Sequence, residues 1–407
     1  MDRLGTINSI KNFKDLKGKR VLLRVDFNVP LTKDLRVGKS EDYRMVKTLP
    51  TIRYLMKKGA RVVIMAHLGR PNGKIVNNLR LDPVAKRLSQ LLAQKVIKID
   101  NILGPKVKKI ISGMKDGEVM MLENVRFDKR EDVGDLPSPG LRQASKNFAR
   151  QLADLGDIYV NDAFAVDHRE QASVSTIQNY LPSYAGFLLE EEVKNLTKVL
   201  KKPKQPLVVI IGGVKISTKI KLIKNFLPVA KNILLGGALA NTVLKAMGIA
   251  VGQSIIESEM FSEIKKIKLT DNKVMVPVDG VMARGLDSKK GRLDALADIK
   301  KDEFILDIGP DTLKLYASII KRARMIVWNG PMGLIEAPFF AKGTRELIKI
   351  LAKSRAEKIV GGGETVQMIR KMGLEKKFNF ISTGGGAMLE FLEGKKLPGL
   401  KKLIINK

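Results

Sequence analysis

The sequence of 407 residues predicts an α/β protein with mainly parallel sheets. Short apolar runs rich in β-branched residues alternate with longer amphipathic segments, which is the rhythm of strands joined by crossover helices. Most of the short runs end in glycines or in polar and basic residues. Ligands of open α/β sheets bind beyond the carboxyl ends of the strands, so we expect the chemistry at these ends. The length suits about two or three domains.

The stretch 207–223, LVVIIGGVKISTKIKLI, shows this pattern most clearly. It predicts a buried strand over 207–211, a tight turn at Gly212-Gly213 and a helix from Lys215 onward, because three isoleucines follow at helical spacing. Lys215 and Lys219 are four residues apart, so we expect them on one helical face beside free backbone N–H groups. Such a corner favours a polyanion. An ordinary strand-to-helix turn with two solvated lysines is the alternative.

The composition excludes several classes of site. The chain has no cysteine, which excludes disulfides, thiolate catalysis and cysteine-ligated metals, and it has only two histidines. Any metal should therefore be bound by oxygen ligands. No apolar segment is long enough to cross a membrane, and the first residues lack the apolar region of a signal peptide. We expect a cytoplasmic protein.

The charge is strongly basic, with 74 Lys and Arg against 42 Asp and Glu and a formal net charge of +32. A solvated surface or an adaptation to a salty cytosol would explain it, as would nonspecific affinity for polyanions. A nucleic-acid-binding protein is the rival interpretation from a different class. Aromatic residues make up only 5% of the chain, so stacking platforms for single strands are scarce.

Four strands are predicted in the first half, at 20–25, 61–65, 118–122 and 158–160. The sequences that follow them are DFNVP, AHLGRP, ENVRF and NDAFAVDHRE, and we expect these tails to converge on one crevice. Each tail alone could be a turn, a cap or a surface loop. Together they hold both histidines of the protein and several forked cationic donors suited to carboxylate and phosphate oxygens. The candidate residues are Asp26, Asn28, His67, Arg70, Arg126, His168 and Arg169.

A long helix is predicted over 184–202, with acidic residues early and lysines late, and the prolines of KPKQP end it. It could be a connecting rod between two α/β halves or an ordinary crossover helix. Periodicity does not choose between them.

The second half repeats the strand-and-glycine scheme in VVIIGGVK, ILLGGALANT, KVMVPVDG, FILDIGPDT, MIVWNGPMG, IVGGGET and NFISTGGGAMLEFL. Glycine lets the backbone approach phosphate oxygens closely, and the helices that follow offer free N–H groups. Five such turns along one sheet edge would form a nucleotide site. The signatures of P-loop, dinucleotide-binding and protein-kinase folds are missing from the sequence.

Taken in order, these motifs closely resemble the phosphoglycerate kinase family over almost the whole chain. They are RVDFNVP, HLGRP, LENVRF, NDAF with HR, GGVKISTK, WNGPMGLIE, GGGET and STGGGAMLEFLEG. The resemblance implies two Rossmann-like three-layer domains that face each other across a cleft, at 1–183 and 203–385. It also implies that helix 184–202 joins them and that segment 386–407 returns to the first domain.

The resemblance further implies reversible phosphoryl transfer between 1,3-bisphosphoglycerate and Mg-ADP, with hinge closure of the two domains. The expected products are 3-phosphoglycerate and ATP. We expect Mg²⁺ as the cofactor, only small-molecule substrates, no specific nucleic acid, no membrane and a monomer. A different kinase that acts on another carboxylated phosphoester on the same scaffold is the closer rival.

Site residues carry over from the family where this sequence matches its motifs. Asp26 and Asn28 would bind the glycerate hydroxyl and carboxylate region, and Arg44 would point at the transferring phosphoryl group, which Lys215 would stabilise. The non-transferred phosphate would be bound by His67, Arg70, Arg126 and Arg169. Gly363 and Gly386 are expected at the catalytic centre. The nucleotide would contact Lys215, Lys219, Gly236, Gly237, Gly309, Asn329, Glu336, Gly362, Gly363, Glu364 and Thr365.

Two positions depart from the family pattern. Glu364 stands where an aspartate is usual, so we expect it to bind the magnesium ion, with a plain helix cap as the alternative. Asp167 stands beside His168 where small residues are usual. It would weaken anion binding or merely orient the imidazole ring.

Overall fold

The computed structural model describes residues 6–38, 41–133, 138–267 and 272–405. The chain divides into two compact units: unit 1 is Met1–Lys194 with Gly394–Lys407, and unit 2 is Asn195–Glu393. The outermost residues of the predicted first domain and C-terminal segment, 1–5 and 406–407, lie outside the described residues. None of the described helices is both long and apolar enough to cross a bilayer.

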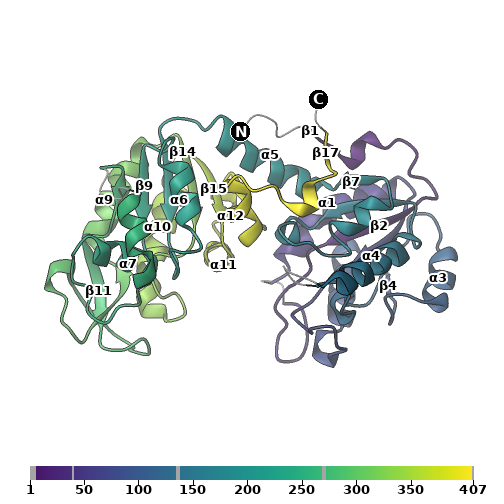
Figure 1. Cartoon of the computed structure of the whole chain (residues 1–407), viewed down its shortest axis with the longest axis horizontal. Coiled ribbons are helices and arrows are strands. Elements are labelled where there is room, and N and C mark those ends of the chain that lie inside the picture. The colour runs from purple at the N-terminus through teal and green to yellow at the C-terminus, as the bar shows by residue number, and fades with distance from the viewer. Residues whose placement is uncertain (1–5, 39–40, 134–137, 268–271, 406–407) are drawn as a thin grey trace. The chain divides into compact units, whose positions relative to one another are not determined.

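Unit 1 contains a six-stranded sheet in the order β4-β5-β3-β2-β6-β7, with every neighbouring pair parallel (Figure 1). Its strands are β2 (Arg20–Val25), β3 (Arg61–Met65), β4 (Val96–Lys98), β5 (Val119–Met121), β6 (Ile158–Asp162) and β7 (Ser183–Ala185). Its helices are α1 (Tyr43–Lys57), α2 (Asp82–Leu92), α3 (Pro105–Ser112) and α4 (Pro139–Ala153). The chain ends pair as β1 (Thr6–Ile7) with antiparallel β17 (Ile404–Ile405).

Alternate residues of β2 belong to two separate cores. Val21, Leu23 and Val25 pack with apolar residues of α1 and α2, whereas Leu22 packs with those of α3 and α4. Side chains of a strand point alternately to its two faces, so helices cover both faces of this sheet. Unit 1 is thus a three-layer sandwich, as the sequence predicts.

Unit 2 contains a second parallel six-stranded sheet, in the order β10-β9-β8-β14-β15-β16. The strands are β8 (Leu207–Ile211), β9 (Asn232–Leu235), β10 (Val274–Met275), β14 (Met325–Asn329), β15 (Glu357–Gly361) and β16 (Phe380–Ile381). The helices of unit 2 are α6 (Ile220–Phe226), α7 (Ala238–Ala246), α8 (Phe261–Lys266), α9 (Pro310–Arg322), α10 (Lys342–Lys353), α11 (Gly363–Lys371) and α12 (Gly386–Leu392). Helix α5 (Phe187–Lys201) precedes β8.

A small antiparallel sheet also belongs to unit 2, in the order β12-β11-β13. Its strands are β11 (Asp279–Ala283), β12 (Arg292–Ala295) and β13 (Phe304–Ile308). The glycine turn after β13 therefore lies outside the main sheet edge. The strands β9, β8, β14, β15 and β16, which lie side by side, bring the other five glycine turns to one edge.

The strands expected from the apolar runs are confirmed, with exact limits for β2, β3 and β8. The helix predicted over 184–202 is confirmed as α5, which begins three residues later and ends one residue earlier than predicted. The helix predicted from Lys215 is wrong in its start, because α6 begins only at Ile220. Residues 214–219 form turns instead, so Lys215 and Lys219 do not share a helical face.

Candidate functional site

Strands β5, β3, β2 and β6 are neighbours in unit 1, and their carboxyl ends carry the predicted tails. Asp26 directly follows β2, and His67 lies two residues beyond β3. Arg126 lies in a short 3₁₀ helix after β5, and Arg169 lies in the loop after β6. Parallel pairing thus brings one carboxylate, one imidazole and two guanidinium groups to one edge of the sheet.

Asp26 organises the first group of these side chains. Its carboxylate accepts hydrogen bonds from the Arg44 guanidinium at 2.7 Å and from the backbone N–H of Asn28 at 3.1 Å. Arg44 also donates to the Asn28 carbonyl at 3.2 Å, and the Asn28 side chain accepts from the Gly69 N–H at 2.9 Å. Asp26 is buried, whereas the Arg44 side chain is about one-third exposed. One guanidinium nitrogen of Arg44 is therefore held by Asp26 and Asn28, and part of the group remains accessible to solvent.

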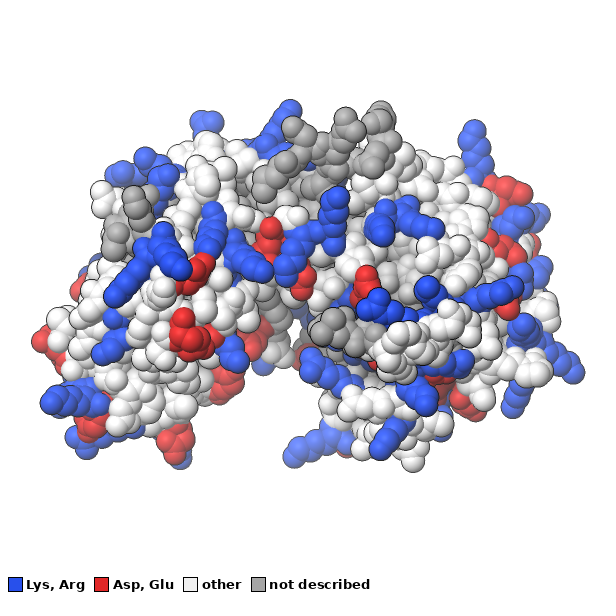
Figure 2. Space-filling model, viewed as in Figure 1, with Lys and Arg blue, Asp and Glu red and all other residues white. Residues whose placement is uncertain are grey.

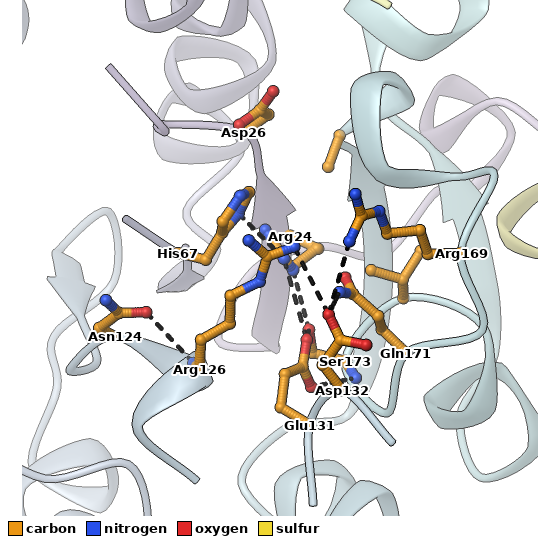
Figure 3. Close-up of polar contacts among 12 residues, drawn as sticks. Arg24, Asp26, His67, Asn124, Arg126, Glu131, Asp132, Arg169, Gln171 and Ser173 are labelled. Carbon is orange, nitrogen blue, oxygen red and sulfur yellow. Dashed lines mark hydrogen bonds and ion pairs between the residues drawn. The ribbon is translucent and has the colours of Figure 1, made fainter. Parts of the chain in front are cut away.

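Three predicted arginines line a cavity of about 420 Å³, together with Asp132. Arg126 donates to the Gly69 carbonyl at 3.0 Å, and both Arg126 and Arg169 face the Asp132 carboxylate at 3.8 and 3.7 Å (Figure 3). Arg70, the third, is exposed at the rim. Forked guanidinium donors around a polar cavity suit a phosphate or carboxylate.

His67 is buried between these groups. Its Nδ1 lies 3.4 Å from a guanidinium nitrogen of Arg24, which must be the donor because guanidinium groups have no acceptor (Figure 3). His67 is therefore a neutral imidazole with its proton on Nε2. Burial lowers the pKa of His67 well below its usual range, and the charges of Arg24, Arg126, Arg44 and Arg169 lower it further.

Arg24 is a residue of this site that the sequence alone does not indicate. It is fully buried on β2, donates to the Ser173 hydroxyl at 2.8 Å and lies 3.9 Å from the Glu131 carboxylate. Ser173 donates in turn to Glu131 from its hydroxyl at 2.6 Å and its N–H at 2.9 Å. An arginine within the apolar run RVLLRV was the available signal, because a buried charge needs partners.

Asp167 and His168 follow β6. Asp167 is fully buried, accepts from the Asn161 side chain at 2.7 Å and, through its carbonyl, accepts from the Gly399 N–H at 2.9 Å. Its carboxylate packs against Gly399, where an added Cβ would lie 2.2 Å from Oδ1. Nε2 of His168 lies 3.4 Å from Nε of Arg169. Asp167 thus holds the C-terminal segment against the tail that carries Arg169.

In unit 2 the glycine turns after β8 and β14 touch each other. Gly330 has a φ of +89°, and an added Cβ there would lie 2.3 Å from the Gly212 carbonyl oxygen. The Gly213 N–H donates to the Pro331 carbonyl at 2.8 Å. The predicted Gly236 and Gly237 continue this surface after β9, where the Gly237 N–H donates to the Met332 carbonyl at 2.9 Å. Only glycine permits such close backbone approach.

The two predicted lysines differ in environment. Lys219 is buried and donates to the Gly212 carbonyl, whereas Lys215 is exposed. Burial lowers the pKa of Lys219 to about 8, and the nearby Glu364 carboxylate acts to raise it. The structure therefore brings Lys219, Glu364 and the glycine turn into one neighbourhood and leaves Lys215 exposed.

Two buried polar atoms at this edge have no partner within the described residues. They are the Asn329 side-chain nitrogen and the Thr365 hydroxyl. Asn329 ends β14, beside Gly361 and Gly362, and Thr365 lies in the first turn of α11. Buried polar groups are normally paired, so these two atoms fit a ligand's hydrogen-bonding groups.

Gly362 caps α11, Gly363 begins it, and Glu364 is exposed in its first turn. No described cluster of three or more His, Cys, Asp or Glu side chains could hold a metal ion alone. Mg²⁺ usually takes one or two carboxylates and completes its shell with water and substrate phosphates. Glu364, with the unpartnered Thr365 hydroxyl beside it, fits that mode.

The remaining predicted residues lie at separate turns. Gly309 caps α9 after β13, packed against Asp279, and Gly386 begins α12. Glu336 is exposed in the loop after β14. That loop is tied to β13 by a hydrogen bond from the Leu334 N–H to the Leu306 carbonyl at 2.8 Å. The glycine turns of the main sheet come together, whereas Gly309 belongs to the smaller sheet.

Comparisons with known proteins show the family of the chain. The family model described as phosphoglycerate kinase matches residues 10–395. A phosphoglycerate kinase of Dictyoglomus turgidum is 44% identical over 398 residues, which are 96% of each chain. One of Moorella thermoacetica is 45% identical over 395 residues, which are 96% of this chain and 97% of the relative.

Solved structures give the same result. The phosphoglycerate kinase of Coxiella burnetii is 38% identical with a TM-score of 0.81, and that of Pyrococcus horikoshii is 34% identical with a TM-score of 0.84. Each match covers 98% of both chains. The family match spans nearly the whole sequence and both units, and the chain therefore belongs to the phosphoglycerate kinase family.

Proposed function

We propose that this protein transfers the acyl phosphate of 1,3-bisphosphoglycerate to Mg-ADP, and catalyses the reverse reaction, in glycolysis and gluconeogenesis. The observation that carries the proposal is the arginine-lined cavity of about 420 Å³ at the carboxyl edge of the unit 1 sheet. Its guanidinium groups match the oxygens of a phosphorylated carboxylic acid. The glycine turns of unit 2 supply the second requirement, a surface for nucleotide phosphates.

In unit 1, we assign the non-transferred phosphate to Arg70, Arg126, Arg169 and His67. The neutral His67 would donate from Nε2, because Arg24 occupies Nδ1. Asp26 and Asn28 would orient the glycerate part. Arg44, held by Asp26 at its base, would direct its open edge at the transferring group.

In unit 2, the nucleotide phosphates would contact Lys219 and the turn Gly362-Gly363, with Asn329 and Thr365 using their unpartnered atoms. Gly236, Gly237, Gly309 and Glu336 would border the adenosine part. Gly386 would offer its N–H beside the reacting phosphate. Glu364 would hold Mg²⁺, which supplies positive charge to the nucleotide phosphates when bound.

Phosphoryl transfer needs positioning and charge neutralisation rather than covalent chemistry from the protein. Arg44 of unit 1 and the exposed Lys215 of unit 2 would share that task on the transferring group. The reaction therefore requires both units to act on one phosphoryl group, which hinge closure during turnover would provide. We further propose that the protein works as a monomer in the cytoplasm.

A coupled spectrophotometric assay tests the proposal by following the consumption of ATP that depends on 3-phosphoglycerate and magnesium. We expect turnover with 3-phosphoglycerate and none with acetate or aspartate as the acceptor. Activity only with another carboxylate would show a different kinase on the same scaffold.

A further inference from the structure

Unit 2 has a polar cavity of about 490 Å³, at the edge of its parallel sheet opposite to the glycine turns. Lys204, Arg324, Arg355, Glu357 and Asn379 line it, with Ala323. Arg324 directly precedes β14, and Arg355 lies two residues before β15, so the cavity lies at the amino ends of these strands. The glycine turns lie at their carboxyl ends. Both strands have five residues, which separates the two edges by about 16 Å.

The charge in this cavity is positive. Its single carboxylate, Glu357, already binds Lys198 at 2.6 Å and Lys204 at 2.9 Å. Arg324 and Arg355 are exposed, and neither guanidinium has a hydrogen bond or ion pair within the described residues. Lys204, Arg324 and Arg355 line the cavity, and Lys198 binds Glu357 without lining it, so these four cations and one carboxylate leave three net positive charges in and beside the cavity. On the face drawn in Figure 2, Lys and Arg side chains clearly outnumber Asp and Glu side chains.

The corresponding edge of unit 1 shows that the fold does not require such unpaired arginines. Arg20 at the start of β2 pairs with Asp157 at 2.6 Å, and Arg61 at the start of β3 pairs with Asp116 at 3.1 Å. Arginines at strand starts are therefore neutralised in unit 1. In unit 2, the two arginines at strand starts keep all their donors available.

The donor set specifies the chemistry of a ligand. Asn379 uses its side-chain oxygen to accept from the Lys358 N–H at 2.9 Å, so its amide N–H₂ is the end left for a ligand. Both oxygens of Glu357 are occupied by lysines. The cavity thus offers donors without a free acceptor, and no aromatic side chain lines it for a nucleobase.

We propose that this cavity, here called the strand-start site, binds a small anion that carries two or more phosphate groups, separately from the catalytic centre. Two guanidinium forks and one ammonium group can each engage a different phosphate group. The three net charges match a short polyphosphate better than a single orthophosphate ion.

Inorganic tripolyphosphate is the probe. It is titrated calorimetrically into the full chain at a fixed ionic strength near 0.1 M, with ADP and 3-phosphoglycerate in excess so that they occupy the catalytic centre. The variant R324Q/R355Q removes both guanidinium groups. The control K289Q/K290Q removes the same charge from two exposed lysines of the same unit.

We expect R324Q/R355Q to weaken tripolyphosphate binding at least about tenfold, while K289Q/K290Q changes it less than about twofold. Orthophosphate should bind about tenfold more weakly than tripolyphosphate. Hydrogen exchange should slow on tripolyphosphate binding in segments 322–326 and 353–358 of the parent protein and of K289Q/K290Q, but not of R324Q/R355Q. Equal weakening in both variants, or none in R324Q/R355Q, would overturn the proposal.

The kinase assay separates this site from the proposed function. All three proteins should turn over 3-phosphoglycerate with the same kcat, because Arg324 and Arg355 lie at the far edge of the sheet. A large loss of kcat in R324Q/R355Q would show that the cavity is not a separate site. Absence of kinase activity in the parent protein would contradict the proposed function. The tripolyphosphate binding measured by calorimetry would still test the strand-start site.

Discussion

The candidate site of unit 1 is built from guanidinium side chains, whereas that of unit 2 is built from glycine turns and two lysines. The arginines of unit 1 are held by carbonyls and carboxylates, such as the Gly69 carbonyl and Asp132 for Arg126. In unit 2 the fixed elements are backbone turns, and the buried polar atoms of Asn329 and Thr365 have no partner within the described residues. Unit 1 is thus preorganised by side chains, and unit 2 by its backbone.

This difference matters for specificity. A cluster of oriented guanidinium groups recognises a particular arrangement of phosphate and carboxylate, because each fork has a direction. The backbone N–H groups of glycine turns bind phosphate oxygens and discriminate little between the groups attached to them. We therefore expect substitutions of the arginines that line the cavity of unit 1 to change substrate affinity, and substitution of Lys215 in unit 2 to change turnover.

The largest effect is expected from Lys215→Ala. Removing a charge that acts on the transferring phosphoryl group should lower kcat by about a thousandfold or more, with the KM for 3-phosphoglycerate nearly unchanged. The control is Lys221→Ala, an exposed lysine of α6, which should keep full activity. Steady-state kinetics decide this, and comparable turnover in the Lys215 variant would remove this lysine from the mechanism.

The second effect concerns two buried carboxylates, one in each unit. Burial raises the pKa of Asp167 to about 7, against hydrogen bonding by Asn161, and burial also raises the pKa of Asp307 to about 7. The folded protein then keeps a proton that the unfolded chain releases near pH 3.8. Unfolding therefore releases this proton between pH 4 and 7, and stability falls as the pH rises through that window.

Substitution by asparagine should have opposite effects on the free energy of unfolding at the two carboxylates. Asp167 has one oxygen without a partner, so Asp167→Asn should raise the free energy of unfolding at pH 8 and change it little at pH 4. The gain can reach about 4 kcal/mol, since one pKa unit corresponds to about 1.4 kcal/mol. Both oxygens of Asp307 accept backbone N–H groups, from Gly343 and Ile308, so Asp307→Asn should destabilise the protein. Denaturant unfolding at both pH values measures this, and an equal gain at pH 4 would contradict the assignment.

A smaller effect is expected from Arg70→Ala in unit 1. Loss of one exposed guanidinium group at the cavity rim should raise the KM for 3-phosphoglycerate about tenfold, with the KM for ATP unchanged. Lys74→Ala, an exposed neighbour outside the cavity lining, serves as the control. A change confined to the KM for ATP would show that the substrate phosphate is assigned to the wrong unit.

Much of this comparison could be predicted from the sequence. The strands β2, β3 and β8 follow from continuous apolar runs, and their tails identify Asp26, His67 and the glycine turns, because strand ends and ligand sites coincide in parallel sheets. The motifs of the tails also pointed to the family. Local pattern and parallel topology sufficed for these features.

The remaining features depend on contacts between distant residues. Arg24, Glu131 and Ser173 form one network across a separation of 149 residues, which periodicity cannot reveal. The start of α6 was predicted too early, because isoleucines at helical spacing in KISTKI also suit the turns that precede a helix. The burial of Asp167 against Gly399 likewise comes from the returning end of the chain.

The smallest effect concerns Glu364, which sharpens the comparison because it is the carboxylate assigned to the magnesium ion in the site of unit 2. A carboxylate in the first turn of α11 is stabilised by the helix dipole and can reach a cation on the nucleotide phosphates. Mg²⁺ keeps most of its waters, so a small shift of the ion or one bridging water can absorb the longer side chain.

Glu364→Gln should therefore raise the magnesium concentration for half-maximal activity about three- to fivefold, while 3-phosphoglycerate binding without nucleotide stays unchanged. Glu364→Asp, which restores the usual family residue, should keep the parent's magnesium dependence, and Glu259→Gln controls for the loss of an exposed carboxylate. Activity is measured against magnesium concentration at saturating ATP. If Glu364→Gln leaves this dependence unchanged, nucleotide phosphates and water alone hold the ion, and Glu364 acts only on the helix dipole and on Lys219.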